Sequence, residues 1–172
     1  MCPFKIRLCT REQFAARVTN ERENGFAKTF VAKADLSGLW PALGTWAGAE
    51  LAAALAYSVN KRPVAGARVA NLQLLHTFPR WRRKGAAALL CREFVRAVAD
   101  QADYYRVSSE PEATPFYRSQ GVVFCGRQKS GCLLAVGRLV GDTLGQCVYD
   151  PADPVVLACV HKKGRGGCVE VF

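Results

Sequence analysis

The segment that most constrains the fold runs from Arg80 to Leu90 and reads RWRRKGAAALL. Four cationic side chains stand directly before one glycine and three alanines, with no spacer between them. An apolar run, ANLQLLHTF, precedes the segment. A helical pattern follows it, with Leu90, Phe94 and Val98 at four-residue steps. The sequence therefore predicts a strand, a short basic loop and the start of a helix in direct succession.

A loop of this composition has the properties of an anion site. Pro79 ends the strand because proline cannot donate to a ladder, and Gly85 lets the backbone approach a ligand closely. The first turn of a helix leaves backbone N–H groups unpaired at the positive end of the helix dipole. A phosphate is the natural occupant of such a place. An exposed basic turn before an ordinary helix would have the same residues.

The overall charge agrees with an anionic partner. The chain has 172 residues, and 24 Lys and Arg against 14 Asp and Glu give it a formal net charge of +10. This excess predicts attraction to a phosphorylated cofactor, a nucleic acid or an acidic protein, although solvated surface charge would also account for it. With half of its residues hydrophobic, the chain can form a full core. We expect a domain over residues 1–140 and a C-terminal extension over residues 141–172 packed on it.

Targeting and metal signals are weak in this sequence. MCPFKIRL carries charges where a signal peptide needs an apolar core, and LAAALAYSV is about half the length that spans a bilayer. The eight cysteines form no CxxC pair, which predicts reduced thiols and a cytoplasmic protein without a membrane partner. Cys159, His161 and Cys168 lie close in sequence, but their spacing fits no standard zinc pattern. We therefore predict no metal site.

The other patterns predict an α/β fold. FKIRLC alternates as a half-buried strand does, and Thr10 and Gln13 form a capping-box pattern for a helix that Gly25 can close. ELAAALAYSV and RVANLQLLHTF flank the turn NKRP, so a β-hairpin is the simpler assignment. Residues 26–48 are harder to assign and hold the least certain strand. After the basic loop and its helix we expect a strand YYRVSS, a short helix TPFYRSQG, and strands VVFCG and CLLAVGRL.

Two stretches together resemble the GCN5-related N-acetyltransferase (GNAT) superfamily. Arg82 to Ala87 fits the Q/R-x-x-G-x-G/A loop, and LLHTFPRWRRKGAAALL is similar to the superfamily's strand 4, loop and helix 3. Downstream, VSSEPEATPFYRSQGVVF resembles strand 5, helix 4 and strand 6, where A-x-x-F-Y-x-x-x-G-F is typical. The matching residues there are Ala113, Phe116, Tyr117 and Gly121, while Val122 and Val123 stand where phenylalanine is usual. The resemblance covers residues 70–126; the N-terminal half fits only by element order.

The resemblance implies a mixed, mostly antiparallel central sheet that splays between strands 4 and 5, with helices on both faces. It also implies an acyl-CoA-dependent N-acyltransferase, most often using acetyl-CoA, in which an amine attacks the thioester directly. The backbone near Leu75 and Thr77 would pair with the pantetheine arm. The residues expected to hold the pyrophosphate are Arg82, Arg83, Lys84, Gly85, Ala86 and Ala87.

The resemblance also suggests catalytic residues. Tyr117 matches a tyrosine that protonates the departing thiolate; a packed aromatic is the alternative. An amine with a pKa near 10 must lose a proton before it attacks, and His76 has a reference pKa that suits a base. Glu110 is the next candidate, followed by Glu112 and Glu50, and deprotonation by water without a dedicated base is equally plausible. Cys91 and Cys125 could carry an acyl group, but burial in apolar stretches is the simpler explanation.

The acceptor is not defined by the sequence. One reading is a small amine or a protein amine. A second is a nucleic-acid-modifying enzyme of the same fold acting on DNA or tRNA, with the basic tail Lys162, Lys163 and Arg165 in the binding surface. A third is a non-catalytic domain that binds CoA or a partner. A monomer or a homodimer agrees with any of these.

Overall fold

The computed structural model describes residues 4–19, 25–32, 39–40, 42–163 and 167–172. The strands are β1 (Lys5–Cys9), β2 (Ala42–Ala47), β3 (Glu50–Val59), β4 (Val69–Thr77), β5 (Tyr104–Ser109), β6 (Gly126–Gln128), β7 (Leu133–Arg138) and β8 (Cys168–Val171). The α-helices are α1 (Arg11–Thr19), α2 (Gly25–Ala32), α3 (Ala86–Val98), α4 (Thr114–Ser119) and α5 (Pro154–Val160). Short 3-10 turns are η2 (Pro79–Trp81), η3 (Pro111–Ala113) and η4 (Leu144–Gln146).

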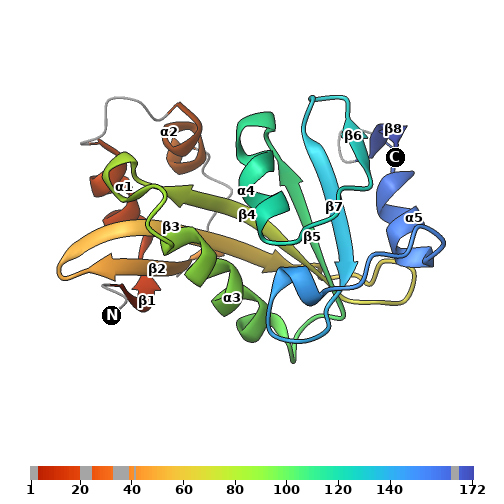
Figure 1. Ribbon diagram of the computed structural model, residues 1–172, viewed down its shortest axis with the longest axis horizontal. Helices are drawn as coiled ribbons and strands as arrows, with labels where there is room; N and C mark the ends of the chain where they lie inside the picture. Colours follow the sequence, from red (N-terminus) through yellow and green to blue (C-terminus); the bar gives the residue numbers. More distant parts are fainter. Residues whose placement is uncertain (1–3, 20–24, 33–38, 41, 164–166) are drawn as a thin grey trace. The chain divides into compact units, whose positions relative to one another are not determined.

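The fold is mixed α/β, as predicted. Within the described residues eight strands form a sheet in the order β1-β2-β3-β4-β5-β7-β6-β8 (Figure 1). The pair β4–β5 is parallel, whereas β1–β2, β2–β3, β5–β7, β6–β7 and β6–β8 are antiparallel. The chain divides into two compact units: residues 1–58 with 73–94, and residues 59–72 with 95–172.

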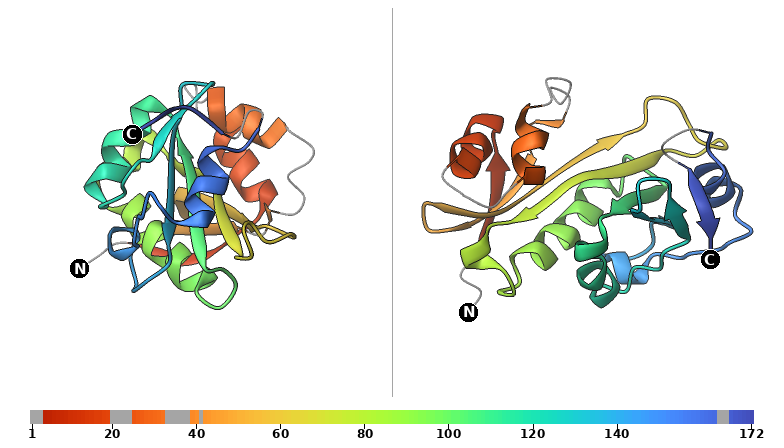
Figure 2. Two further views of the ribbon diagram at one scale, coloured as in Figure 1. Left: turned by 90° about the vertical axis from the view of Figure 1, so that its right-hand side faces the viewer. Right: turned by 90° about the horizontal axis from the view of Figure 1, so that it is seen from above.

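The first unit contains β1, β2, most of β3, the end of β4 and the start of α3. Its helices α1 and α2 lie on one face of these strands and α3 begins on the other (Figure 2). Thr10 and Gln13 form the predicted capping box at α1, with hydrogen bonds of 2.8 and 3.2 Å. The central strand β3 is fully buried from Leu51 to Ala56. Alanine favours helices, but here its small side chains let elements pack closely on both sides of a strand.

The second unit contains β5 to β8, the start of β4, and the helices α4 and α5. The parallel register runs from Val69 opposite Tyr104 to Leu72 opposite Val107. Its core joins α5 to these strands through Val155, Val156, Cys159 and Val160. Residues after 140 thus supply α5 and β8 to this unit, while the boundary at residue 140 stays a prediction.

Two local expectations differ from the structure. Gly25 begins α2 instead of closing the preceding helix, and residues 20–24 lie outside the described residues. The predicted strand VVFCG begins only at Gly126. At the start of this run the Val122 amide donates to the Tyr117 carbonyl (3.1 Å), so Val122 still belongs to the turn after α4. The apolar run VVLACV forms α5, which Asp153 caps by accepting from the Val155 amide at 2.8 Å.

No described helix has the length and hydrophobicity needed to cross a membrane. The cysteines in the described ranges, Cys9, Cys91, Cys125, Cys132, Cys147, Cys159 and Cys168, are free thiols.

Candidate functional site

The basic loop and the helix after it have the geometry of an anion site. Arg83 and Gly85 have positive φ angles, 59° and 87°, and Lys84 between them does not. Alternation of this kind turns successive amides toward one concave side. Helix α3 starts at Ala86, and its first bond joins the Leu89 amide to the Gly85 carbonyl at 3.1 Å. The amides of residues 86–88 precede that bond, so they are available to an anion.

The residues of this loop have the character of diphosphate ligands. Gly85 is exposed, and a Cβ built on it would meet no heavy atom within 4 Å. Glycine is therefore required by its backbone angle and not by crowding. Ala86 is buried and Ala87 is half-buried, so neither side chain projects far beyond the backbone. Exposed Arg82, Arg83 and Lys84 supply positive charge beside the amides, and a diphosphate group of CoA fits this donor set.

The cationic side chains do not all point freely into solvent. The Arg82 Nε donates to the Thr77 carbonyl at 3.2 Å, which ties the loop to the end of β4. The Lys84 ammonium lies 4.9 Å from the centre of the Trp81 ring, and the Arg80 guanidinium lies 5.3 Å from it. Contacts of Arg82 and of Lys84 thus restrain the loop on both sides of Arg83.

The end of β4 offers backbone groups on one edge. The Phe78 amide donates to the Ala52 carbonyl of β3 at 3.0 Å. Because successive residues of an extended chain direct their N–H and C=O groups to alternate edges, those of Thr77, the residue before Phe78, point to the edge away from β3. The bond between Arg82 and the Thr77 carbonyl agrees with this direction.

His76 lies among aromatic rings. Its ring is 4.9 Å from that of Phe78 and 6.1 Å from that of Phe14, both edge-on. Burial, and to a smaller extent the Arg82 charge, lowers the pKa of His76 to about 4. An imidazole with this pKa stays neutral near pH 7 but is a weak base, which counts against the role that the sequence suggested for it.

This environment predicts a loss of stability in acid. Below its ordinary pKa of 6.5 the ring takes up a proton in the unfolded chain, while the folded chain resists protonation down to about pH 4. Stability therefore falls as the pH drops from 6.5 toward 4, with a loss of about 2 kcal/mol at pH 5. The free energy of unfolding is measured with urea at pH 7 and at pH 5. The decrease between the two pH values should be about 2 kcal/mol smaller in His76→Gln than in the wild type. Equal pH dependence in the two proteins would contradict the assignment.

Tyr117 and Glu110 lie in the second unit. Tyr117 is 4% exposed on α4, and its ring packs 5.3 Å from that of Phe116. The Glu110 carbonyl accepts from the Ala113 amide at 3.0 Å and from the Thr114 hydroxyl at 3.2 Å. These bonds fix the backbone between β5 and α4 and leave the Glu110 side chain exposed. Glu112 is exposed as well.

The cysteines proposed as alternatives are poor nucleophiles. Burial raises the pKa of Cys91 to about 12, and burial with the neighbouring Cys168 raises the pKa of Cys125 to about 11. Both thiols are protonated at neutral pH, and the thiolate is the reactive form. Among the described side chains no group of three or more His, Cys, Asp or Glu residues is arranged to hold a metal.

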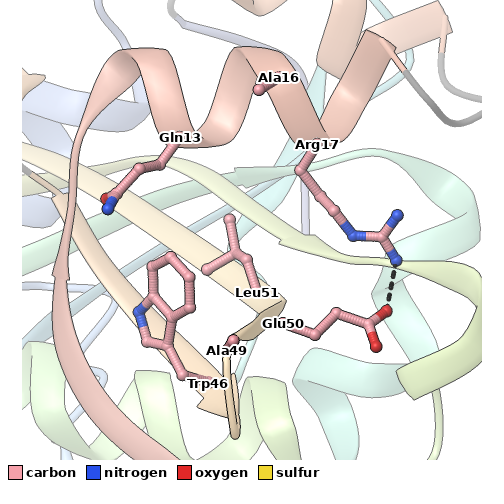
Figure 3. Close-up of a pocket in the computed structure, with 7 residues that line it drawn as sticks. All are labelled: Gln13, Ala16, Arg17, Trp46, Ala49, Glu50 and Leu51. Atoms are coloured by element: carbon pink, nitrogen blue, oxygen red, sulfur yellow. Dashed lines mark hydrogen bonds and ion pairs between the residues drawn. The ribbon is translucent and has the colours of Figure 1, made fainter.

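A polar cluster around Glu50 was not predicted. Glu50 begins β3 and lines a pocket of about 410 Å³ between α1 and the β2–β3 turn (Figure 3). Its carboxylate accepts from Arg17 at 2.8 Å and from the Trp81 indole at 3.0 Å. The residues that line the pocket together with Glu50 are Gln13, Ala16, Arg17, Trp46, Ala49 and Leu51.

The structure brings part of the predicted site together. The loop residues from Arg82 to Ala87, the β4 residues Leu75 and Thr77, and His76 all belong to the first unit. Tyr117 and Glu110 belong to the second.

Comparison with known proteins agrees with the fold and the loop. A family model described as an acetyltransferase (GNAT) domain matches residues 43–132. No protein of curated function matches the sequence significantly. The matched range runs from the second residue of β2 to beyond the end of β6 and contains the complete basic loop.

Solved structures from several organisms share this architecture. Ard1 from Thermoplasma volcanium is 17% identical with a TM-score of 0.61, over 81% of this chain and 99% of that one. The ribosomal-protein-S18-alanine N-acetyltransferase from Escherichia coli is 13% identical with a TM-score of 0.59, over 86% and 99%. The Bacillus subtilis N-acetyltransferase YlbP, solved in complex with coenzyme A, is 14% identical with a TM-score of 0.57, over 78% and 96%. At these identities the likeness is one of fold.

The resemblance over residues 70–126 is confirmed by a family match that contains this range and covers more than half of the chain. The shared fold agrees with it. The chain belongs to the GNAT family of acetyltransferases.

Proposed function

We propose that this acetyltransferase moves the acetyl group of acetyl-CoA to an amine by direct attack, without a covalent enzyme intermediate. The observation that carries the proposal is the left-handed Gly85 at the start of α3, where the family's loop motif falls. The amine nitrogen attacks the thioester carbonyl, the carbon–sulfur bond breaks, and the CoA thiolate leaves. The ammonium form of the substrate loses one proton before the attack; the nitrogen loses a second proton after it, and the thiolate gains one.

The first unit would bind the CoA portion of the substrate. The amides from Gly85 to Ala87 and the charges of Arg82, Arg83 and Lys84 would hold the diphosphate. The backbone groups of Leu75 and Thr77 at the end of β4 would pair with the amides of the pantetheine arm. In that complex the Thr77 carbonyl would be shared with Arg82, which donates to it at 3.2 Å.

Tyr117 would act as the acid. The family motif assigns the protonation of the thiolate to Tyr117, a buried tyrosine on α4. For removal of the amine proton we favour Glu110 or water over His76, because Glu110 is exposed beside the backbone that leads into α4 whereas the His76 ring has a pKa of about 4. The described residues give no support to a nucleic-acid acceptor or to a non-catalytic role.

Stabilisation by substrate tests the proposal. Acetyl-CoA at 100 times its Kd should stabilise the native chain by about 2.7 kcal/mol, which is readily seen as a rise in Tm. ATP at the same concentration is the control for attraction of any polyphosphate to a chain of net charge +10. Release of free thiol from acetyl-CoA in the presence of a panel of primary amines then identifies the acceptor class. No rise in Tm with millimolar acetyl-CoA, or an equal rise with ATP, would overturn the proposal.

A further inference from the structure

The Glu50 carboxylate connects three elements of the first unit. One oxygen accepts from Arg17 of α1 at 2.8 Å and from the Trp81 indole at 3.0 Å. The other accepts from Arg80 at 3.2 Å. Trp81 and Arg80 form the 3-10 turn η2 directly before the basic loop. The start of β3 is therefore bonded both to a helix and to the approach to the loop.

The bonds of Glu50 differ in strength. The side chains of Glu50 and Arg17 are only 30% and 22% exposed, so their charge-assisted bond is partly protected from water. The Arg80 side chain is 71% exposed, and exposed ion pairs contribute little. The bonds to Arg17 and to Trp81 therefore contribute most to holding the Glu50 carboxylate in place.

Trp81 transmits this anchoring to the loop. The Lys84 ammonium lies 4.9 Å from its ring centre, within the range of a cation–π contact. The Trp81 ring also contacts the ring of Phe4, edge-on with the ring centres 5.7 Å apart. The backbone of η2 is closed by a bond from the Trp81 amide to the Phe78 carbonyl at 2.8 Å. The orientation of the indole therefore determines the position of the Lys84 side chain that packs on it. Gly85, the left-handed residue of the loop, follows Lys84 directly in the sequence.

We propose that Glu50 is a positioning residue for CoA: by holding Trp81 it keeps the basic loop in its binding geometry before the ligand arrives. The inference rests on the proposed function, because it assumes that the loop binds the CoA diphosphate. When the loop already has its binding geometry, the binding of CoA costs less free energy for ordering the loop. With its carboxylate engaged by Arg17 and Trp81, Glu50 serves the loop and is not the general base.

The charge of Glu50 makes the inference sharply testable. Removing a carboxylate beside a basic loop makes the region more positive, so long-range electrostatics alone predict tighter binding of an anion. Loss of positioning predicts the opposite, weaker binding. The sign of the change in CoA affinity therefore separates the two effects.

The experiment compares the affinities of CoA and of pantetheine, the fragment that has no phosphates, by titration calorimetry with competition for the weaker ligand. In Glu50→Ala we expect CoA to bind about tenfold more weakly, the effect of about 1.4 kcal/mol, while pantetheine affinity stays within twofold. Glu50→Gln keeps an acceptor for the Trp81 indole, so its CoA affinity should fall by less than that of Glu50→Ala. Glu12→Ala is the matched control, because it removes an exposed carboxylate from α1 of the same unit and should not weaken CoA binding.

Trp81→Phe keeps the inference testable if Glu50→Ala does not fold, since it removes the indole donor and keeps an aromatic ring. It should also weaken the binding of CoA and leave the binding of pantetheine unchanged. The double variant with Glu50→Gln should lose less CoA-binding free energy than the sum of the losses in the two single variants. If the wild type binds CoA no better than pantetheine, the proposed function is wrong. If the wild type prefers CoA and Glu50→Ala keeps that preference, the positioning role is wrong.

Discussion

Gly85→Val should weaken CoA binding about 100-fold, or about 2.7 kcal/mol, in a calorimetric titration. Gly85 has a φ angle of +87° at the start of α3, and a β-branched side chain is a clear outlier in that region. The loop would have to change its backbone angles, and the amides of residues 86–88 would no longer converge with those of the loop. Since a Cβ at this position meets no heavy atom within 4 Å, the effect comes from the backbone and not from a clash.

Gly131→Val is the matched control for this effect. Gly131 has the same φ angle, +87°, and the same open space around an added Cβ, but it lies in the turn between β6 and β7. Both substitutions should cost about 1–2 kcal/mol of stability through left-handed strain. Only Gly85→Val should lose affinity for CoA. An equal loss of affinity in the two variants would mean that the loop has no special part in binding.

Tyr117→Phe should lower kcat by about 100-fold, the scale of acid–base catalysis by one side chain, and leave the Kd of CoA within twofold. The ring would still pack against Phe116, 5.3 Å away, because phenylalanine keeps its shape. Only the hydroxyl, which the proposed mechanism uses to protonate the thiolate, is removed. Thiol release under saturating acetyl-CoA measures the effect.

Tyr104→Phe provides the comparison for loss of a tyrosine hydroxyl without catalytic function. The Tyr104 hydroxyl donates to the Asp153 carboxylate at 2.6 Å, and Asp153 caps α5. This variant should lose about 1–3 kcal/mol of stability, as expected for a hydrogen bond to a charged group, and keep its kcat. Unchanged turnover in Tyr117→Phe would remove the hydroxyl from the mechanism.

The basic loop could be predicted from sequence because its information is local. Pro79 follows the strand β4, Gly85 supplies the left-handed angle, and α3 buries Leu90 and Phe94 at the expected four-residue step. The strand from Tyr104 to Ser109 was likewise predicted with its observed bounds. Local periodicity and turn chemistry are sufficient wherever the contacts that matter lie within a few residues.

The surroundings of individual side chains could not be predicted in this way. The sequence gives no direct sign that His76 lies among Phe14 and Phe78, which lowers its pKa. Glu50 meets Arg17 and Trp81 from 33 and 31 residues away. Such contacts depend on how β3 packs beside α1 and η2, so a sequence pattern shows the residue types but not their partners.

The central claim is that the start of α3 and the loop before it bind the diphosphate of CoA. A crystal structure of the complex with CoA tests it most directly. We expect the diphosphate oxygens within hydrogen-bond distance, about 2.7–3.2 Å, of the amides from Gly85 to Ala88. A diphosphate bound elsewhere, with these amides facing solvent, would contradict the account.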